Sequence, residues 1–339
     1  MASSRPQIVR PRIAIVGGDS LLAKEIRDLL AGSGSSIDLI SAAANESTVL
    51  GSDEEDALVL APLNSESLAG AKVAFLAGTP ASSRRALKAN PPDGPVLIDL
   101  TGALEEHPHA RLRAPLAEQQ PTEKLTSETV FVIAHPAATM IAMVLGILGQ
   151  RAAILRSLAH VFEPASERGK KGLDELQQQT VAMLSFKPLK QDVFDTQLAF
   201  NVLARYGEEA EEPLEDIEAR VERHLASLLA VQKAAQRPLP MPSLRLLQAP
   251  VFHGQSVSLW IELDADPEPS ILAEWLHTAG IDVRPDEPPS NANIAGQNGV
   301  SAGAITRDAN HPRGYWIWLV ADNLRLAAEN AVMVAREIL

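Results

Sequence analysis

The stretch RIAIVGGDSLLAKEIRDLL, Arg12 to Leu30, predicts how the first part of the chain folds. Its opening residues are apolar and end in two glycines, which is typical of a buried strand followed by a tight turn. Leucine and isoleucine side chains then recur at helical spacing, at positions 22, 26, 29 and 30. Gly32 and Gly34 end that helix. We therefore expect a strand–turn–helix unit of the kind that opens an α/β fold.

More apolar stretches of strand length follow, and a short helix near Ser82 to Ala89 separates two of them. Strands that alternate with helices form a parallel, doubly wound sheet. A polar, proline-containing loop is expected from Glu105 to Ser127. The four additional predicted strands are SIDLISAAA (36–44), AKVAFLAGT (71–79), GPVLIDLTG (94–102) and TVFVIAH (129–135).

The pattern changes after residue 148, and the second part reads as α+β with a mostly antiparallel or mixed sheet. The acidic run Glu208 to Glu212 is interpreted as a solvated loop. The strand Tyr315 to Leu319 is apolar on both faces, so we expect the core or a subunit interface to cover it. The predicted elements are a strand and amphipathic helix (157–184), a long helix (214–234), two strands about Gly254 (244–264), two further strands (301–308 and 314–322) and a final helix (323–339).

Composition narrows the class of protein. With 339 residues the chain is longer than one hydrophobic core usually serves, so two domains are expected. A net charge of −13 opposes binding to nucleic acid and to anionic membranes. The absence of cysteine excludes disulfides, thiolate metal sites and a cysteine nucleophile. The N-terminus has no apolar signal segment, and the apolar run Met140 to Leu145 is too short to span a bilayer, so we expect a cytoplasmic protein.

The corner HPAAT, His135 to Thr139, lies between a predicted buried strand and an apolar helix. A nucleophile often occupies such a corner, because the helix N-terminus stabilises anions and lowers the pKa of a thiol. Here two alanines occupy the corner. Thr139 beside His135 has no visible orienting acid, and His253 is expected in a strand, so both histidines are interpreted as structural. The pair His107 and His109 lacks a third ligand nearby, and no metal site is predicted.

The turn GGDSLLA after the first strand is a poor nucleotide-binding loop. A G-x-x-G-x-x-G spacing would need glycine at positions 17, 20 and 23, and only Gly17 is present. Ser20 or Asp19 can cap the helix instead, and the carboxylate of Asp19 would repel a pyrophosphate. Asp38 is expected at the start of the second strand, not at its end where a ribose-binding acid is needed, and no arginine follows that strand. Weak nucleotide binding, or none, is predicted.

Several longer motifs, taken in order, resemble those of the aspartate-semialdehyde dehydrogenase family over nearly the full chain. The closing motif and the corner are the most specific of them. The motifs are VGGDSLLA (16–23), FLAGTPAS (75–82), VLIDLTGAL (96–104), IAHPAAT (133–139), EPASERGKKGLDEL (163–176), AFNVL (199–203), APVFHGQS (249–256) and WLVADNLRLAAENAV (318–332).

The resemblance implies a reaction that the residues of this chain do not support. The family forms a thioester on a corner cysteine, uses a histidine as acid and base, passes hydride to NADP and releases the acyl group to phosphate. The residues at the family's functional positions are Ala138 for the cysteine, Gln255 for the histidine, Glu163 for the substrate-orienting glutamine, Gln248 for the carboxylate-binding arginine and Glu105 for the phosphate-site arginine.

Other substitutions agree with this loss. His135 and Ala137 replace the two asparagines that flank the family's proline, Glu218 matches a lysine in the long helix, and Arg168 replaces a small residue. From their spacing, Glu163 and Arg168 are expected to pair across the substrate pocket and fill it. The chain is in this respect similar to the Usg-type paralogues of the family, which also lack the catalytic cysteine.

By this resemblance we expect a Rossmann-type domain, 1–134, completed by a C-terminal helix, 322–339, and an α+β dimerisation domain with a mixed sheet, 135–321. We expect a homodimer, or a mixed dimer with an active paralogue. The leading hypothesis is a catalytically silent protein that acts by binding or interaction; the alternative is an NAD(P)-dependent oxidoreductase with altered chemistry. We expect no cofactor. If one binds, the resemblance implies NADP, and its contacts would be Gly17, Asp19, Ser20, Leu21, Ala77, Gly78, Thr79 and Asn323.

Overall fold

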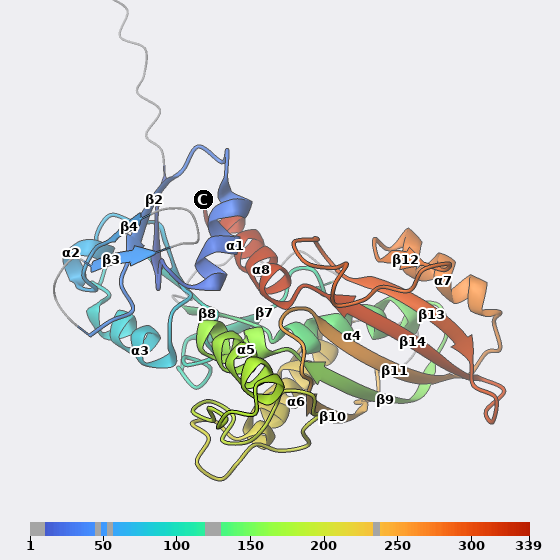
Figure 1. Ribbon diagram of the computed structural model, residues 1–339. Helices are drawn as coiled ribbons and strands as arrows, with labels where there is room; N and C mark the ends of the chain where they lie inside the picture. Colours follow the sequence, from blue (N-terminus) through green and yellow to red (C-terminus); the bar gives the residue numbers. More distant parts are fainter. Residues whose placement is uncertain (1–10, 45–48, 53–56, 119–129, 233–237) are drawn as a thin grey trace, which may run out of the picture. The chain divides into compact units, whose positions relative to one another are not determined.

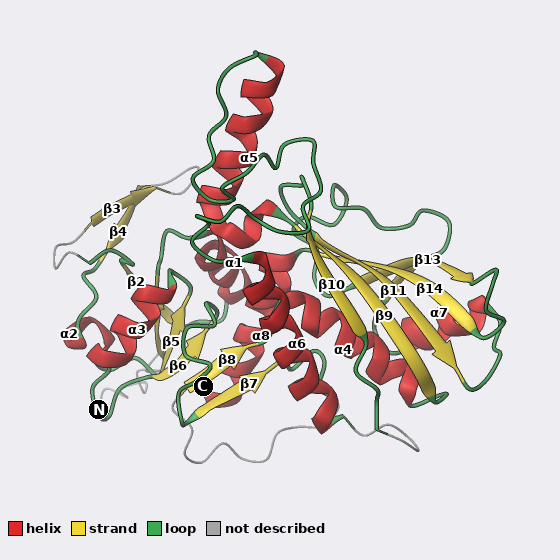
Figure 2. Cartoon of the chain, turned by 90° about the horizontal axis from the view of Figure 1, so that it is seen from below, coloured by secondary structure: helices red, strands yellow, loops and turns green. Residues whose placement is uncertain are grey.

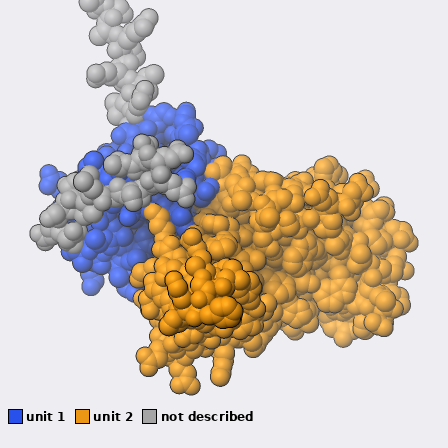
Figure 3. Space-filling model, in the orientation of Figure 1, with its two compact units in different colours: residues 1–111, 125–133, 331–339 blue, residues 112–124, 134–330 orange. Residues whose placement is uncertain are grey.

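The computed structural model describes residues 11–44, 49–52, 57–118, 130–232 and 238–339. The chain forms two compact units, which Figure 3 draws in blue and orange. The first unit comprises residues 1–111, 125–133 and 331–339, and the second comprises residues 112–124 and 134–330.

The first unit is built on a six-stranded sheet with the strand order β2-β1-β5-β6-β8-β7. The pairs β1/β2, β1/β5, β5/β6 and β6/β8 are all parallel, as the alternation of strands and helices predicts. Helix α3 packs against β1 and β5. The elements are β1 Arg12–Val16, α1 Leu21–Leu30, β2 Ser36–Ile40, β3 Val49–Ser52, β4 Ala57–Leu60, α2 Ser65–Leu68, β5 Val73–Leu76, α3 Pro80–Ala89, β6 Val96–Asp99, β7 Ala110–Arg113 and β8 Val130–Ile133.

Three details of the first unit correct the sequence-based prediction. Strands β3 and β4 form an antiparallel pair that the sequence did not predict. Strand β7 lies within the segment predicted to be a loop. Asp38 is in the middle of β2, opposite Ala14, and its carboxylate accepts a hydrogen bond from Arg12. The strand is shorter than predicted: its pairing with β1 ends at Val16 and Ile40, and the N–H of Ser41 donates to the carbonyl of Ala61.

The second unit contains a mixed six-stranded sheet with the strand order β10-β9-β11-β14-β13-β12. Strand β9 pairs parallel with β10 and antiparallel with β11, and β14 lies antiparallel to both β11 and β13. The mixed sheet of the predicted α+β domain is therefore confirmed. The strands are β9 Ile154–Glu163, β10 Ser243–Gln248, β11 Gln255–Leu263, β12 Asp282–Arg284, β13 Ser301–Arg307 and β14 Gly314–Ala321.

Helix α4, Pro136–Gly149, is at the centre of the second unit. Its residues are almost all buried, since an apolar sequence on every side needs neighbours on every side. It packs against β9, β11 and two other helices, α6 and α7. Helix α5 projects away from the sheet (Figure 2). The remaining elements are the 3₁₀ helix η1 Ala165–Arg168, α5 Gly169–Leu184, α6 Leu214–Val231 and α7 Pro269–Thr278. Helix α8, Asn323–Ile338, begins in the second unit, and its residues from 331 onward belong to the first.

Among the described residues, no helix combines the length and the apolar character that crossing a membrane requires. Helix α4, the most apolar stretch, ends after 14 residues. Figure 1 shows α4 behind the strands of the second sheet. Its apolar surface is covered by the protein itself.

Candidate functional site

The corner between β8 and α4 has the strand–turn–helix form that the sequence predicts. His135 is the N-cap of α4, and its Nδ1 accepts the backbone N–H of Ala137 at 3.2 Å. The backbone N–H of His135 in turn donates to Nδ1 of His224 on α6 at 2.9 Å. Ala138 is completely buried and presents only a methyl group. The hydroxyl of Thr139 donates back to the carbonyl of His135, so it serves the helix backbone.

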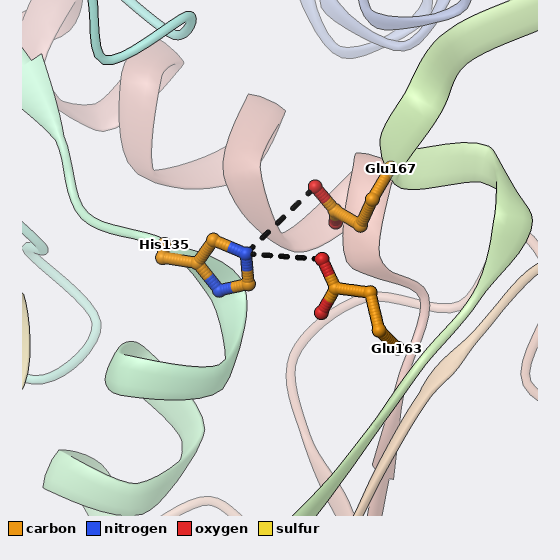
Figure 4. A group of neighbouring side chains, drawn as sticks. All are labelled: His135, Glu163 and Glu167. Carbon is orange, nitrogen blue, oxygen red and sulfur yellow. Dashed lines mark ion pairs between the residues drawn. The ribbon is translucent and has the colours of Figure 1, made fainter. Parts of the chain in front are cut away.

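Two carboxylates face the imidazole of His135 from the end of β9 and from η1 (Figure 4). The Nε2 atom of His135 lies 3.4 Å from Oε1 of Glu163 and 4.0 Å from Oε2 of Glu167. Glu163 is completely buried, and His135 is 8% exposed. His135 is therefore a member of a buried charged cluster, which the sequence-based interpretation as a structural histidine missed.

Arg168 brings positive charge to the same cluster. Its Nη2 lies 3.7 Å from Oε1 of Glu163, so the predicted Glu163–Arg168 pair is present. Arg168 also pairs with Glu212, which accepts a second ion pair from Arg220 of α6. The acidic run is a loop, as predicted, and Glu208 is exposed, but Glu212 is ion-paired and only partly exposed.

Gln255 and Gln248, which occupy functional positions of the family, both form hydrogen bonds to Glu163 within the second sheet. Gln255 begins β11, and its Nε2 donates to Oε2 of Glu163 at 2.7 Å. Gln248 ends β10, opposite Glu163 in the strand register, and its Nε2 donates to the Glu163 carbonyl at 2.8 Å. The hydroxyl of Tyr206 donates to Oε1 of Gln248 at 2.6 Å. Both amides are completely buried, and both are tied to Glu163.

The cluster shifts the pKa of several members. Burial alone lowers the pKa of His135, but Glu163 and Glu167 more than offset this and raise it above its ordinary value. Burial and the neighbouring charge of Glu163 raise the pKa of Glu167. Burial opposes ionisation of Glu212 as well, but the guanidinium groups of Arg168 and Arg220 outweigh it and lower its pKa.

By distance alone, His135, Glu163 and Glu167 could hold a divalent metal, and they are the one such group within the described ranges. The hydrogen bond at Nδ1 argues against it. Because Nδ1 accepts the N–H of Ala137, the proton of a neutral imidazole is on Nε2, the atom that would have to bind the metal. The guanidinium of Arg168 is also already beside Glu163. The arrangement suits a proton better than a metal ion.

The predicted nucleotide contacts of the first unit are largely used by the protein backbone. Gly17 and Gly18 donate their N–H groups to the carbonyl of Ile40, at 2.8 and 3.1 Å. Gly17 has a φ of +82°, and a Cβ there would come within 2.3 Å of the Cα of Gly78. Ser20 caps α1, as predicted, by accepting the N–H of Ala23.

Several of the other predicted nucleotide contacts form hydrogen bonds within the protein or are buried. Thr79 forms a capping box with Ser82 at the start of α3, which is why this helix begins before Ser82. Ala77 is buried after β5, Leu21 opens α1 and Asp19 precedes it. In the second unit, the side chain of Asn323 contacts Ser166, Gly254 and Glu167.

The structure corrects the sequence-based prediction at two further side chains, Arg85 and His253. Arg85 of α3 donates to the carbonyl of Ala42 at 2.6 Å, and so brings a guanidinium to the end of β2 where the sequence indicated no arginine. His253 is in a bend before β11 and not in a strand, because β11 begins only at Gln255.

Two further family positions are Glu105 and Glu218. Glu105 belongs to the first unit and is half-buried. Glu218 accepts the N–H of Leu246 and lies 3.7 Å from Arg245. His107 and His109 are neighbours in a turn, with ring centroids 5.9 Å apart. No local sequence signal identifies the distant partners Glu167, Tyr206, Glu212, Arg220 and His224.

Comparison with known proteins places this geometry in context. The family description "Semialdehyde dehydrogenase, dimerisation domain" matches residues 154–326. The chain is 29% identical over 291 residues to a USG-1 protein homolog of Pseudomonas aeruginosa, covering 83% of this chain and 82% of the relative. It is 27% identical over 336 residues to the aspartate-semialdehyde dehydrogenase of Aquifex aeolicus, covering 96% of each.

Solved structures agree on the fold. A probable aspartate-semialdehyde dehydrogenase from Pseudomonas aeruginosa has a TM-score of 0.80 at 25% identity, covering 96% of this chain and 98% of that one. Aspartate semialdehyde dehydrogenase II from Vibrio cholerae, solved in complex with ASA, has a TM-score of 0.77 at 18% identity, covering 97% and 98%. The Rossmann-like sheet and the second mixed sheet are both shared.

Proposed function

We propose that this chain, which belongs to the semialdehyde dehydrogenase family, does not carry out phosphate-dependent acyl transfer and acts instead by binding another molecule. The observation that carries this proposal is the contact between Gln255 and Glu163, 2.7 Å from Nε2 to Oε2. By the family resemblance, these positions belong to the acid/base and to the residue that orients the substrate. Here they bind each other, and an amide cannot exchange protons near neutral pH.

The surrounding charges support the same proposal. A buried carboxylate at Glu163, with Glu167 close by, would repel the carboxylate of an aspartyl substrate. Gln248, where the family has a carboxylate-binding arginine, is neutral and already holds Tyr206. Ala138 has no group that could form a thioester.

The family's nicotinamide nucleotide does not fit the first unit well. A pyrophosphate needs free backbone N–H groups at the glycine turn, and those of Gly17 and Gly18 already donate to Ile40. The carboxylate of Asp19 adds repulsion. We therefore derive no hydride-transfer step for this chain.

A stepwise reconstruction of the site tests the proposal. Ala138→Cys alone should give no meaningful oxidation of aspartate semialdehyde, because a returned thiol still lacks its base and its substrate contacts. Catalytic groups that act as a unit are strongly non-additive. The same protein with Gln255→His, Gln248→Arg and Glu105→Arg added is the matched comparison. A single variant within roughly a hundredfold of an active family member, about 2.7 kcal/mol, would contradict the proposal.

An oxidoreductase with altered chemistry is the second candidate, and Arg85 favours it. In doubly wound folds an arginine near the end of the second strand can hold the 2′-phosphate of NADP, and Arg85 reaches the end of β2 from α3. Thermal stabilisation by NADP that exceeds stabilisation by NAD, and that Arg85→Ala abolishes, would support this candidate. The same assay with amino-acid derivatives would search for the ligand of a silent homologue.

A mixed dimer with an active paralogue is a further form of the binding proposal, since the matched region is the family's dimerisation domain. Co-purification of a paralogue with this chain would distinguish it from a homodimer that binds a small ligand. A cytoplasmic location stays a prediction of the sequence.

A further inference from the structure

His135 connects four elements of the second unit through three different atoms. Its Nδ1 accepts the N–H of Ala137 in the first turn of α4. Its backbone N–H donates to His224 on α6. Its Nε2 faces Glu163 at the end of β9 and Glu167 in η1. The side chain therefore has one side that must accept a hydrogen bond and one side that faces negative charge.

The carboxylates on one side favour the protonated imidazole, whereas the hydrogen bond on the other side requires the neutral one. In the neutral imidazole the proton is on Nε2, toward the carboxylates, and Nδ1 keeps the lone pair that caps α4. A second proton can only be added to Nδ1. It would then point at the N–H of Ala137, one of the helix N–H groups that has no partner within the helix. The positive end of the helix dipole adds to this repulsion.

We propose that His135 is a proton-operated switch at the N-terminus of α4. Uptake of a proton from water on Nδ1 breaks the cap at Ala137 and gives the ring a positive charge, so that Nε2 forms ion pairs with the carboxylates. The site differs from the family pattern, in which the resemblance places an asparagine at this position. The charged and titratable groups that act on His135 are Glu163 from β9, Glu167 from η1, and Arg220 and His224 from α6, and Arg168 of η1 pairs with Glu163.

The two effects of the proton have opposite signs, which makes the switch measurable. The pKa of His135 is raised in the folded protein, so its contribution to global stability is fully present below the unfolded pKa and is lost as pH rises through the folded pKa. The cap behaves in the reverse way, because it needs the neutral ring. Acidification should therefore raise the contribution of His135 to global stability while it loosens the first turn of α4.

Hydrogen exchange at the Ala137 amide, corrected for the intrinsic rate, tests the switch in the full chain. Between about pH 8 and about pH 5 the protection of this amide should fall about fivefold, which corresponds to about 1 kcal/mol for a lost cap. His135→Asn is the matched variant, since asparagine is a good N-cap that does not titrate; it should abolish the pH dependence. His160→Asn, on β9 outside the cluster, should leave it unchanged.

Imidazole ¹⁵N shifts give a second readout that does not depend on exchange. At high pH, His135 should carry its proton on Nε2 and have an unprotonated Nδ1. The proposal is wrong if the neutral ring carries its proton on Nδ1, if Ala137 keeps the same protection across the titration, or if His135→Asn retains the full pH dependence.

Discussion

At the residue scale, Glu212 shows how one carboxylate of an acidic loop is held in place by ion pairs in the second unit. Its carboxylate accepts ion pairs from Arg168 and Arg220. A charge pattern cannot reveal this, because Arg168 is 44 positions away in the sequence. The sequence did predict the Glu163–Arg168 pair, from the spacing of the two residues around one turn. Local spacing can thus predict a close pair, but not the distant partner that completes the cluster.

Glu212→Gln should lower the free energy of unfolding by about 1–3 kcal/mol near neutral pH, because two charge-assisted contacts are lost. The pKa of Glu212 is lowered in the folded protein, so its contribution is present above the unfolded pKa and is lost as pH falls through the folded pKa. Urea unfolding of both proteins should therefore converge as pH drops below 4.5.

Glu208→Gln is the matched control, because Glu208 is exposed in the same acidic run. It should change the free energy of unfolding by less than about 0.5 kcal/mol. A Glu212→Gln protein that keeps the same deficit at low pH would show that the lost energy is not that of the ionised carboxylate.

At the scale of elements, the glycine turn between β1 and α1 uses the backbone N–H groups of Gly17 and Gly18 for its own hydrogen bonds, so they are not available to a ligand. The sequence predicted the strand, the turn, the helix and the Ser20 cap correctly, since all of them depend on local residue types. It missed β3, β4 and β7, which are each only four residues long; β3 contains a glycine and β7 two arginines, whereas β4 is apolar but short. It also missed Arg85, because only the folded α3 brings that residue to the end of β2.

We expect NADP to bind weakly, without saturation at micromolar concentrations. The N–H groups of Gly17 and Gly18 are occupied by Ile40, and Asp19 opposes a pyrophosphate. Isothermal titration calorimetry of the full chain measures this. A micromolar dissociation constant would overturn the expectation, and its loss in Arg85→Ala would identify the residue responsible.

At the scale of the whole molecule, the open face of the second sheet explains why an assembly is expected. Tyr315 and Ile317 of β14 point into the core, whereas Trp316 and Trp318 point to the opposite face and are only half-buried. Phe162 of β9 joins them, with its ring 6.1 Å from that of Trp318. The sequence predicted an apolar strand covered on both sides, and the structure places aromatic side chains on the side that its own helices leave open.

Light scattering at micromolar protein should give the mass of a homodimer formed through this face. Replacing Trp316 by glutamate should convert it to a monomer, because a buried charge without a partner is costly. Val231→Glu, at an exposed apolar position on α6, is the control and should leave the mass unchanged. A wild-type protein with a monomer mass would refute the prediction.

The most direct test of the account is the turnover of aspartate semialdehyde by the wild-type chain, with NADP and phosphate present. A family member with measured aspartate-semialdehyde dehydrogenase activity serves as the positive control under the same conditions. With Ala138 in the corner and Gln255 bound to Glu163, we predict NADPH formation no faster than without enzyme. Phosphate-dependent turnover above that rate, proportional to the amount of this protein, would contradict the proposal that its active site is silent.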